Sequence, residues 1–301
     1  MRRRRECARN DVGVRWPAWA VVSGLDVEAN AEEESLAKQR RMHERRGWAF
    51  TLCVAILKPL LLLLTKRDWA GGENIPATGG AVIAANHASH IDPLTFAHFI
   101  WDHGRLPRYL AKAALWDVRF LGAIMRDTGQ IPVYRASTDA SKAFSAAVEA
   151  VKDGKIVIVY PEGTLTRQPE LWPMVGKTGA ARIALSADVP VIPVAQWGAH
   201  EILYPYAKRP RLFPRRTLHA RAGKPVDLDD LRGGPITPAV LHEATDRIMS
   251  DITSLLEEIR GERAPAERFD PRKAGVASLG NPHAEQTQAR QRPGRSKRHA
   301  R

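Results

Sequence analysis

The central part of the chain alternates short apolar runs with segments of helical periodicity. Three runs have the length and composition of buried strands: residues 81–85 (AVIAA), 155–160 (KIVIVY) and 189–198 (VPVIPVAQWG). Three segments repeat apolar residues at helical spacing: residues 93–101, 139–154 and 177–188. Helices that alternate with apolar strands predict an α/β fold, in which a layered central β-sheet is flanked by helices.

Three further regions extend this pattern. Residues 108–129 predict a short strand and then a helix, and QIPVYR, residues 130–135, predicts a strand that ends at Arg135. Residues 237–261 predict a long amphipathic helix that closes the fold, with a cap at Thr237. Asp92 stands where its carboxylate would cap the helix at 93–101.

The most apolar stretch of the chain is WAFTLCVAILKPLLLLL, Trp48 to Leu64, with basic residues on both sides. As a helix it would be about 25 Å long, short of a hydrocarbon core of about 30 Å. Pro59 predicts a kink or break, and Lys58 is expected to reach towards the membrane surface. The pattern favours a helix that lies in one leaflet over a full span, and the alternative is a buried core helix.

Charge changes the picture by implying an anionic partner. The formal net charge is +13, which suits nucleic acid, an acidic membrane surface or a phosphorylated substrate. The basic residues gather at the termini and flanks, and no strand combines aromatic and basic residues in a nucleic-acid-binding pattern. We therefore expect an anionic membrane surface and no nucleic acid. The two cysteines, Cys7 and Cys53, indicate neither a disulfide framework nor a metal site.

Composition divides the chain into four parts. We expect a disordered or weakly helical basic extension at residues 1–40 and a membrane-associated helical segment at 41–70. The α/β domain would follow at 71–260 and a disordered basic tail at 261–301.

The stretch AANHASHIDP, residues 84–93, carries the first candidate chemistry. It places His87, His90 and Asp92 directly after a buried strand, where polar groups are costly unless they pair or react. A metal site, a His–Asp catalytic dyad and a hydrogen-bonded structural loop are the three alternatives. The metal site is disfavoured because no third or fourth ligand lies nearby in the sequence.

Polar residues also follow the other predicted strands. Arg135 ends one strand, and YPEGTLTR, residues 160–167, follows another. Strand ends that gather at one edge of an α/β sheet form a crevice for ligands. A guanidinium such as that of Arg135 suits phosphate, and backbone N–H groups around Gly163 suit an anion. No serine stands in a nucleophile elbow, so a dyad of His87 and Asp92 would activate a hydroxyl of the substrate.

Four blocks in order resemble those of the glycerophospholipid acyltransferases, specifically the 1-acyl-glycerol-3-phosphate acyltransferase family. They are NHASHID with the His-x4-Asp pair, GQIPVYR, YPEGT and VIPVA, at residues 86–92, 129–135, 160–164 and 191–195. The resemblance covers about residues 48–223. It implies an acyltransferase domain at 71–260.

The resemblance implies O-acyl transfer in phospholipid biosynthesis, with phosphatidic acid as the product. His87 would deprotonate the free hydroxyl of a lysophospholipid, which attacks a thioester of coenzyme A or acyl carrier protein, and Asp92 would orient His87. The residues that would bind the acceptor are Arg135, Glu162, Gly163, Thr164 and Arg167. No cofactor and no metal are implied, and the enzyme would work at the cytoplasmic face of the cell membrane.

The third block departs from the family pattern. An arginine commonly follows Glu-Gly-Thr in the family, whereas Leu165 stands there and the next arginine is Arg167. We expect Arg167 to reach the same phosphate, because residues two apart point to the same side of an extended segment. The alternative is a solvent-facing Arg167.

Several rival functions remain open from the sequence. The acceptor could be glycerol-3-phosphate, another lysophospholipid or an amphiphile without phosphate. A hydrolase is disfavoured because water would have to outcompete a bound hydroxyl. A basic nucleic-acid-binding protein and a lipid-binding protein without catalysis are the alternatives that are not enzymes.

Overall fold

A computed structural model describes residues 42–133 and 140–276. The predicted extension at 1–40, Arg135 and the part of the predicted tail beyond residue 276 lie outside the described residues. The helices are α2 (Trp48–Leu64), α3 (Asp92–Asp102), α4 (Arg119–Asp127), α5 (Ala140–Lys152), α6 (Gly179–Ala187), α7 (Ala199–Ile202) and α8 (Pro238–Arg260). The strands are β1 (Thr65–Ala70), β2 (Ala81–Ala85), β3 (Leu110–Lys112), β4 (Ile131–Val133), β5 (Ile156–Val159), β6 (Val191–Trp197) and β7 (Arg216–Ala222). Three short 3₁₀ turns lie at Gly72–Asn74, Ala113–Leu115 and Asp229–Leu231.

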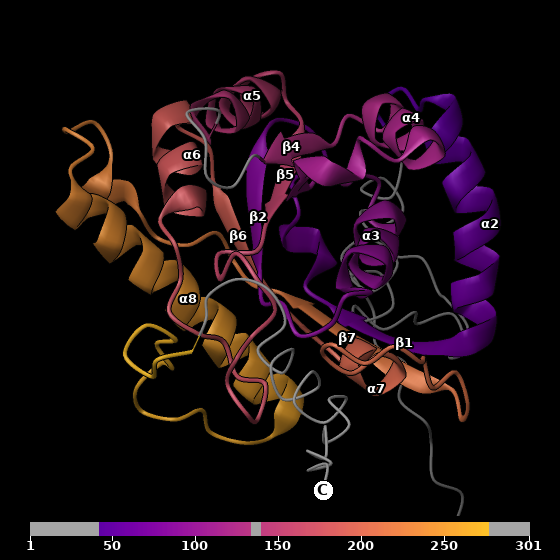
Figure 1. Cartoon of the computed structure of the whole chain (residues 1–301). Helices are drawn as coiled ribbons and strands as arrows, with labels where there is room; N and C mark the ends of the chain where they lie inside the picture. The colour runs from indigo at the N-terminus through magenta and orange to yellow at the C-terminus, as the bar shows by residue number, and fades with distance from the viewer. Residues whose placement is uncertain (1–41, 134–139, 277–301) are drawn as a thin grey trace, which may run out of the picture. The chain divides into compact units, whose positions relative to one another are not determined.

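The main sheet has the strand order β1-β7-β6-β2-β5 (Figure 1). Strands β5, β2 and β6 run parallel, β7 runs antiparallel to β6, and β1 runs parallel to β7. The carboxyl ends of β5, β2 and β6 therefore meet at one edge of the sheet, where α/β proteins build their sites.

The core lies on both faces of this sheet, which explains why β2 is apolar at every position. Val82 and Ala84 pack with α5, α6 and α8, whereas Ile83 and Ala85 pack with α3. Figure 1 shows α5, α6 and α8 on one side of the sheet and α3 on the other. The predicted layered α/β architecture is confirmed.

Strands β1 and β7 were not anticipated from the sequence. The strand β1 reads TKRDWA and pairs with β7 along its whole length, from Thr65 opposite Arg216 to Ala70 opposite Arg221. These six residues belong to the segment at 41–70 that was expected to be helical. Such a polar strand carries no apolar period, so only its pairing with β7 defines it.

The strand β4 does not join the main sheet. It pairs in parallel with β3 in a separate two-stranded sheet, which approaches the main sheet through a bridge between Tyr109 and Ile158. The expectation that QIPVYR supplies a neighbouring strand end to the main sheet is therefore wrong. The third strand end at the edge belongs to β6.

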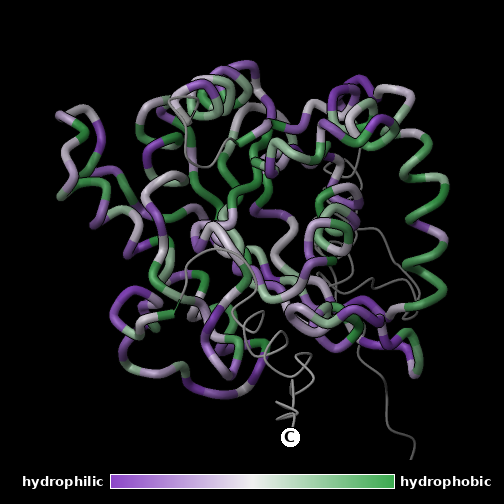
Figure 2. Tube along the Cα trace, viewed as in Figure 1, coloured by the Kyte–Doolittle hydropathy of each residue, from purple (hydrophilic) through white to green (hydrophobic). Residues whose placement is uncertain are grey.

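Helix α2 runs without interruption through Pro59, so the predicted break is absent. Lys58 does not reach outwards, because its ammonium pairs with Asp102 Oδ1 at 2.6 Å. Ala49 is buried, whereas Ile56 and Leu63 are 58% and 69% exposed. Figure 2 shows α2 as a mainly hydrophobic helix. Among the described residues, no helix combines the length and apolar character needed to cross a bilayer.

Helix α8 begins and ends as its sequence predicts. The Thr237 hydroxyl accepts the N–H of Val240, Pro238 is the first helical residue, and Gly261 ends the helix with φ of 64°. Residues 261–276, which were expected to start the disordered tail, instead contact the domain: the Val175 N–H donates to Phe269 O, and the Arg268 guanidinium pairs with Asp246.

Candidate active site

The loop that carries His87 is fixed at the end of β2 by the neighbouring strand β6. Asn86 and Gln196 exchange three hydrogen bonds, with distances from 2.8 to 3.0 Å. Both side chains are buried, and Asn86 Nδ2, Asn86 Oδ1 and Gln196 Nε2 each meet a backbone partner on the other residue. This pair fixes the direction in which the chain leaves the sheet, so His87 emerges at the edge where the parallel strands end.

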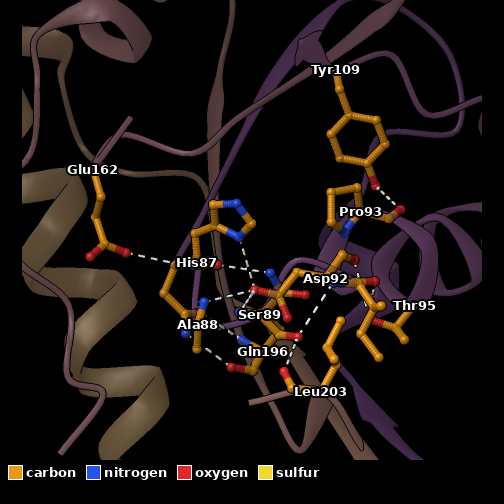
Figure 3. Close-up of polar contacts among 12 residues, drawn as sticks. His87, Ala88, Ser89, Asp92, Pro93, Thr95, Tyr109, Glu162, Gln196 and Leu203 are labelled. Atoms are coloured by element: carbon orange, nitrogen blue, oxygen red, sulfur yellow. Dashed lines mark hydrogen bonds and ion pairs between the residues drawn. The ribbon is translucent and has the colours of Figure 1, made fainter. Parts of the chain in front are cut away.

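His87 and Asp92 are in direct contact (Figure 3). The ring Nδ1 of His87 lies 2.9 Å from Asp92 Oδ2. The same oxygen accepts the backbone N–H groups of Ala88 at 2.7 Å and Ser89 at 2.8 Å. The predicted helix cap is therefore wrong: Asp92 is the first residue of α3, and its carboxylate turns back to the preceding loop.

These hydrogen bonds define the protonation pattern of the pair. Three donors on one buried oxygen favour the ionised carboxylate of Asp92, which is 1% exposed. An ionised carboxylate only accepts, so Nδ1 of His87 carries the proton and Nε2 has its lone pair. Among the described residues, the structure shows no hydrogen bond to Nε2. The arrangement can accept a proton from a hydroxyl placed beside Nε2.

Glu162 holds the third block against the first. Its carboxyl oxygens accept the His87 N–H at 3.0 Å and the Met174 N–H at 3.1 Å. Burial raises the pKa of Glu162 to about 8, the nearby charge of Asp92 adds to the rise, and the two N–H groups oppose it. Glu162 is therefore mainly protonated at neutral pH, and its oxygens are occupied by the backbone.

Two more contacts join the His87 loop to the segment at 160–166. The ring of His87 stacks on Tyr160 with centroids 4.1 Å apart and planes 13° from parallel. The Thr166 N–H donates to His87 O at 2.8 Å. Burial raises the pKa of Tyr160 well above its usual range, so the phenol stays protonated. The stack fixes the ring plane of His87, and with the Asp92 contact it leaves one orientation for Nε2.

Gly163 and Thr164 lie in the turn that follows Glu162. Gly163 has φ of 69°, a left-handed conformation that favours glycine, and its N–H donates to Tyr160 O at 2.9 Å. The Lys177 ammonium lies directly over Gly163, 2.7 Å from the place where a Cβ would stand. This lysine adds positive charge to the turn, and the sequence offered no signal for it.

Leu165 is buried in the core, whereas Arg167 contacts an aromatic ring. Leu165 is buried at 2% exposure, so it fills the core and leaves no room for a charge at that position. The guanidinium of Arg167 lies over the ring of Tyr206 at 5.2 Å, and that ring meets His90 edge-on at 5.6 Å. Arg167 thus lies beside the His90 end of the loop, and the structure shows no contact between it and His87.

His90 lies in the same loop as His87. Burial lowers the pKa of His90, and the neighbouring His87 lowers it further. Within residues 42–133 and 140–276, no three His, Cys, Asp or Glu side chains are grouped closely enough to hold a metal ion.

The structure brings together most of the predicted site residues. His87, Asp92 and Glu162 are joined by hydrogen bonds, and Gly163 and Thr164 lie in the turn next to Glu162. Sequence reasoning missed the stack on Tyr160 and the Asn86–Gln196 pair. Their residue types stood in or beside the blocks, but only the fold shows that they meet.

Comparison with known proteins finds a matching family model. The family model described as Acyltransferase matches residues 66–197, which contain the His87–Asp92 pair and the 160–167 segment. The chain is therefore similar to acyltransferases over these residues.

The chain is also similar to 1-acyl-sn-glycerol-3-phosphate acyltransferases. It is 26% identical to the Bacillus subtilis enzyme over 215 residues, which cover 70% of this chain and all of that one. It is 34% identical to the Salmonella typhimurium enzyme over 143 residues, which cover 46% of this chain and 54% of that one. The chain thus spans the whole of the first relative and about half of the second.

A solved structure has the same fold. The 1-acyl-sn-glycerophosphate (LPA) acyltransferase PlsC from Thermotoga maritima superposes with a TM-score of 0.56 at 21% identity, over 71% of this chain and 81% of that one.

Proposed function

We propose that this chain transfers an acyl chain from an acyl thioester to the free hydroxyl of 1-acyl-glycerol-3-phosphate and so makes phosphatidic acid. The observation that carries the proposal is the His87–Asp92 pair, with Nδ1 held by the buried carboxylate at 2.9 Å and Nε2 directed away from it. The names of the relatives support the choice of acceptor.

In the reaction, Nε2 of His87 takes the proton of the acceptor hydroxyl as its oxygen attacks the thioester carbonyl. Asp92 stabilises the imidazolium that forms, because its carboxylate is already oriented on Nδ1. The tetrahedral intermediate then expels the thiolate, which takes the proton from Nε2. The new ester and the free thiol leave, and His87 returns to its neutral form.

Binding of the acceptor is assigned to the third block and to Arg135. The positive charge of Lys177 over the turn at Gly163 and Thr164 favours a phosphate there. Arg135 and Arg167 would supply the guanidinium groups. Glu162 is assigned a positioning part, because its carboxyl oxygens are occupied by the backbone of His87 and Met174.

An acceptor panel tests the proposed substrate. Purified protein is given acyl-coenzyme A or acyl-acyl carrier protein with lysophosphatidic acid, glycerol-3-phosphate, lysophosphatidylcholine or monoacylglycerol, and each product is quantified. We expect the highest kcat/KM with lysophosphatidic acid. A preference for glycerol-3-phosphate or for an acceptor without a phosphomonoester would replace the proposed reaction with that of the preferred acceptor.

Arg167 provides a prediction about phosphate binding. Arg167→Ala is expected to reduce kcat/KM for lysophosphatidic acid by about 2–5 kcal/mol in transition-state terms, as for one partner of a desolvated charge pair. A double variant with Arg135→Ala should lose less than the sum if both contact one phosphate. The matched control is Arg182→Ala, which removes an exposed arginine that stacks on Phe144 in the same way. Wild-type kinetics in Arg167→Ala would mean that Arg167 does not bind the phosphate and only stacks on Tyr206.

We further propose that α2 attaches the enzyme to the cytoplasmic face of the membrane by lying in one leaflet. Its outer side chains, including Ile56 and Leu63, are exposed, whereas its inner side packs on the domain through Ala49 and Lys58. An exposed apolar helix face of this kind suits the interface between headgroups and acyl chains.

The double substitution of Ile56→Ser and Leu63→Ser is expected to release the protein from phospholipid vesicles in a sedimentation assay. Both side chains are largely exposed, so the fold should be retained. Val175→Ser with Ile236→Ser, which changes two exposed apolar residues elsewhere, is the control. Unchanged sedimentation of the α2 variant would reject α2 as the anchor.

A further inference from the structure

The loop at residues 203–215, between α7 and β7, connects the active site to the end of α2. At the start of the loop, Leu203 O accepts the hydroxyl of Ser89 at 2.6 Å. Ser89 precedes Asp92 by three residues in the active-site loop. At the end of the 203–215 loop, the Arg215 guanidinium donates to Leu62 O at 2.8 Å and Thr65 O at 2.6 Å. The middle is also fixed, because the Arg211 N–H donates to Ile202 O. We call these residues the basic loop.

The basic loop encloses a positively charged cavity of about 750 Å³ against α7. Lys208, Arg209, Arg211 and Arg216 line it together with one carboxylate, that of Glu201. Glu201 pairs with Arg216 at 3.2 Å, and the other three cations have no ion-pair partner among the described residues. The cavity therefore presents unneutralised positive charge, which favours an anionic group.

The same loop exposes apolar side chains. Phe213 is 76% exposed and Leu212 lies beside it, with Arg211 and Arg215 on either side. Because Arg215 is bound to the last turn of α2, the loop stands next to Leu63, the most exposed leucine of that helix. Figure 1 shows the loop that leads into β7 reaching the end of α2 where β1 begins. An exposed phenylalanine between arginines, beside an apolar helix face, suits a membrane interface.

Two simpler occupants account for only part of this arrangement. A soluble anion would neutralise the cations but would leave Phe213 and Leu212 in water. A purely apolar contact would bury Phe213 but would leave the three cations without partners. The headgroup of an anionic phospholipid within a bilayer accounts for both, since its phosphate and its acyl chains lie next to each other.

We propose that the basic loop is a second lipid contact, in which the cavity binds the phosphate headgroup of an anionic phospholipid and Phe213 enters the bilayer beside α2. The proposal rests on the proposed function only in that the enzyme works at a lipid surface. It places the active-site loop next to the membrane through the Ser89–Leu203 contact.

The test is equilibrium binding of the full chain to vesicles of phosphatidylcholine alone or mixed with phosphatidylglycerol, without substrates. We expect tighter binding to the mixed vesicles. Arg209→Gln with Arg211→Gln should weaken binding to mixed vesicles about twenty-five-fold, at about fivefold for each charge near an anionic surface, and should leave binding to phosphatidylcholine unchanged. Phe213→Ala should weaken binding to both vesicles about tenfold.

Matched controls come from exposed residues outside the loop. Lys224→Gln removes an exposed cation beyond the other end of β7, and Ile236→Ala removes an exposed apolar side chain before α8. Both should bind vesicles like wild type. Equal binding of the loop variants and wild type, with loss only in the α2 variant, would overturn the basic loop proposal. Inorganic phosphate binding that Arg209→Gln with Arg211→Gln abolishes, without any change in vesicle binding, would assign the cavity to a soluble anion. Because no acyl transfer is measured, these outcomes are independent of the proposed reaction.

Discussion

Replacing His87 by alanine is expected to reduce kcat/KM for acyl transfer by about 10²–10⁴, the usual contribution of a general base. The ring lies at the surface of the site and is stacked on Tyr160, so its loss should leave the fold intact. Circular dichroism and the thermal unfolding midpoint provide the folding check. Turnover like that of wild type in a folded His87→Ala protein would falsify the dyad mechanism.

Asp92→Asn is expected to reduce kcat/KM less than His87→Ala does. The reason lies in the hydrogen bonds of the Asp92 carboxylate. One oxygen accepts three donors, from the His87 ring and from the N–H groups of Ala88 and Ser89. In the asparagine variant the amide oxygen must take that place, because the amide nitrogen would face three donors. The His87 tautomer is then retained, and only the stabilisation of the imidazolium is lost. We therefore expect Asp92→Asn to retain more activity than Asp92→Ala, and equal activity of the two would contradict this role.

Glu162→Ala is expected to have the largest effect on stability. It leaves two N–H groups without acceptors, the part-buried one of His87 and the buried one of Met174, at about 1–3 kcal/mol each. The free energy of unfolding from denaturant titration should fall by about 2–6 kcal/mol, and the loop of His87 should lose its fixed position. Glu162→Gln retains one acceptor oxygen, so it should lose about half as much. An unchanged unfolding free energy in Glu162→Ala would show that Glu162 does not hold the loop of His87 in place.

Glu162 also gives the unfolding free energy a specific pH dependence. The folded protein retains the Glu162 proton up to a pKa of about 8, whereas the unfolded chain releases it near the ordinary value of 4.5. The stabilisation from the raised pKa is complete below pH 4.5 and is lost as the pH rises to about 8. The difference in unfolding free energy between wild type and Glu162→Gln should therefore shrink across this range by a few kcal/mol. A difference that is constant with pH would contradict the raised pKa.

The sequence predicted the central layers because their residues carry strong local signals. Strands β2, β5 and β6 are continuous apolar runs, and α5, α6 and α8 have clear helical periods, so burial on both sheet faces follows from composition alone. The strand β1 has no such signal, since it is defined by its pairing with β7. Of the kink or break predicted at Pro59, the break is absent, because the packing of α2 on the domain outweighs the local cost of a proline.

The candidate site was predictable in its residue types but not in its contacts. The spacing of His87 and Asp92 indicated a pair, and the structure shows that pair at hydrogen-bond distance. The backbone contacts of Glu162 could not be read from the sequence, because they join segments 75 and 12 residues apart. Likewise, the charge of Lys177 over Gly163 depends on how α6 approaches the turn.

The most direct test of the central claim is the product that the purified protein makes from labelled acyl-coenzyme A and lysophosphatidic acid. We expect labelled phosphatidic acid and free coenzyme A thiol in equal amounts, with both lost together in His87→Ala. Release of labelled free fatty acid in place of phosphatidic acid would contradict transfer to a lipid hydroxyl and would make the chain a thioester hydrolase.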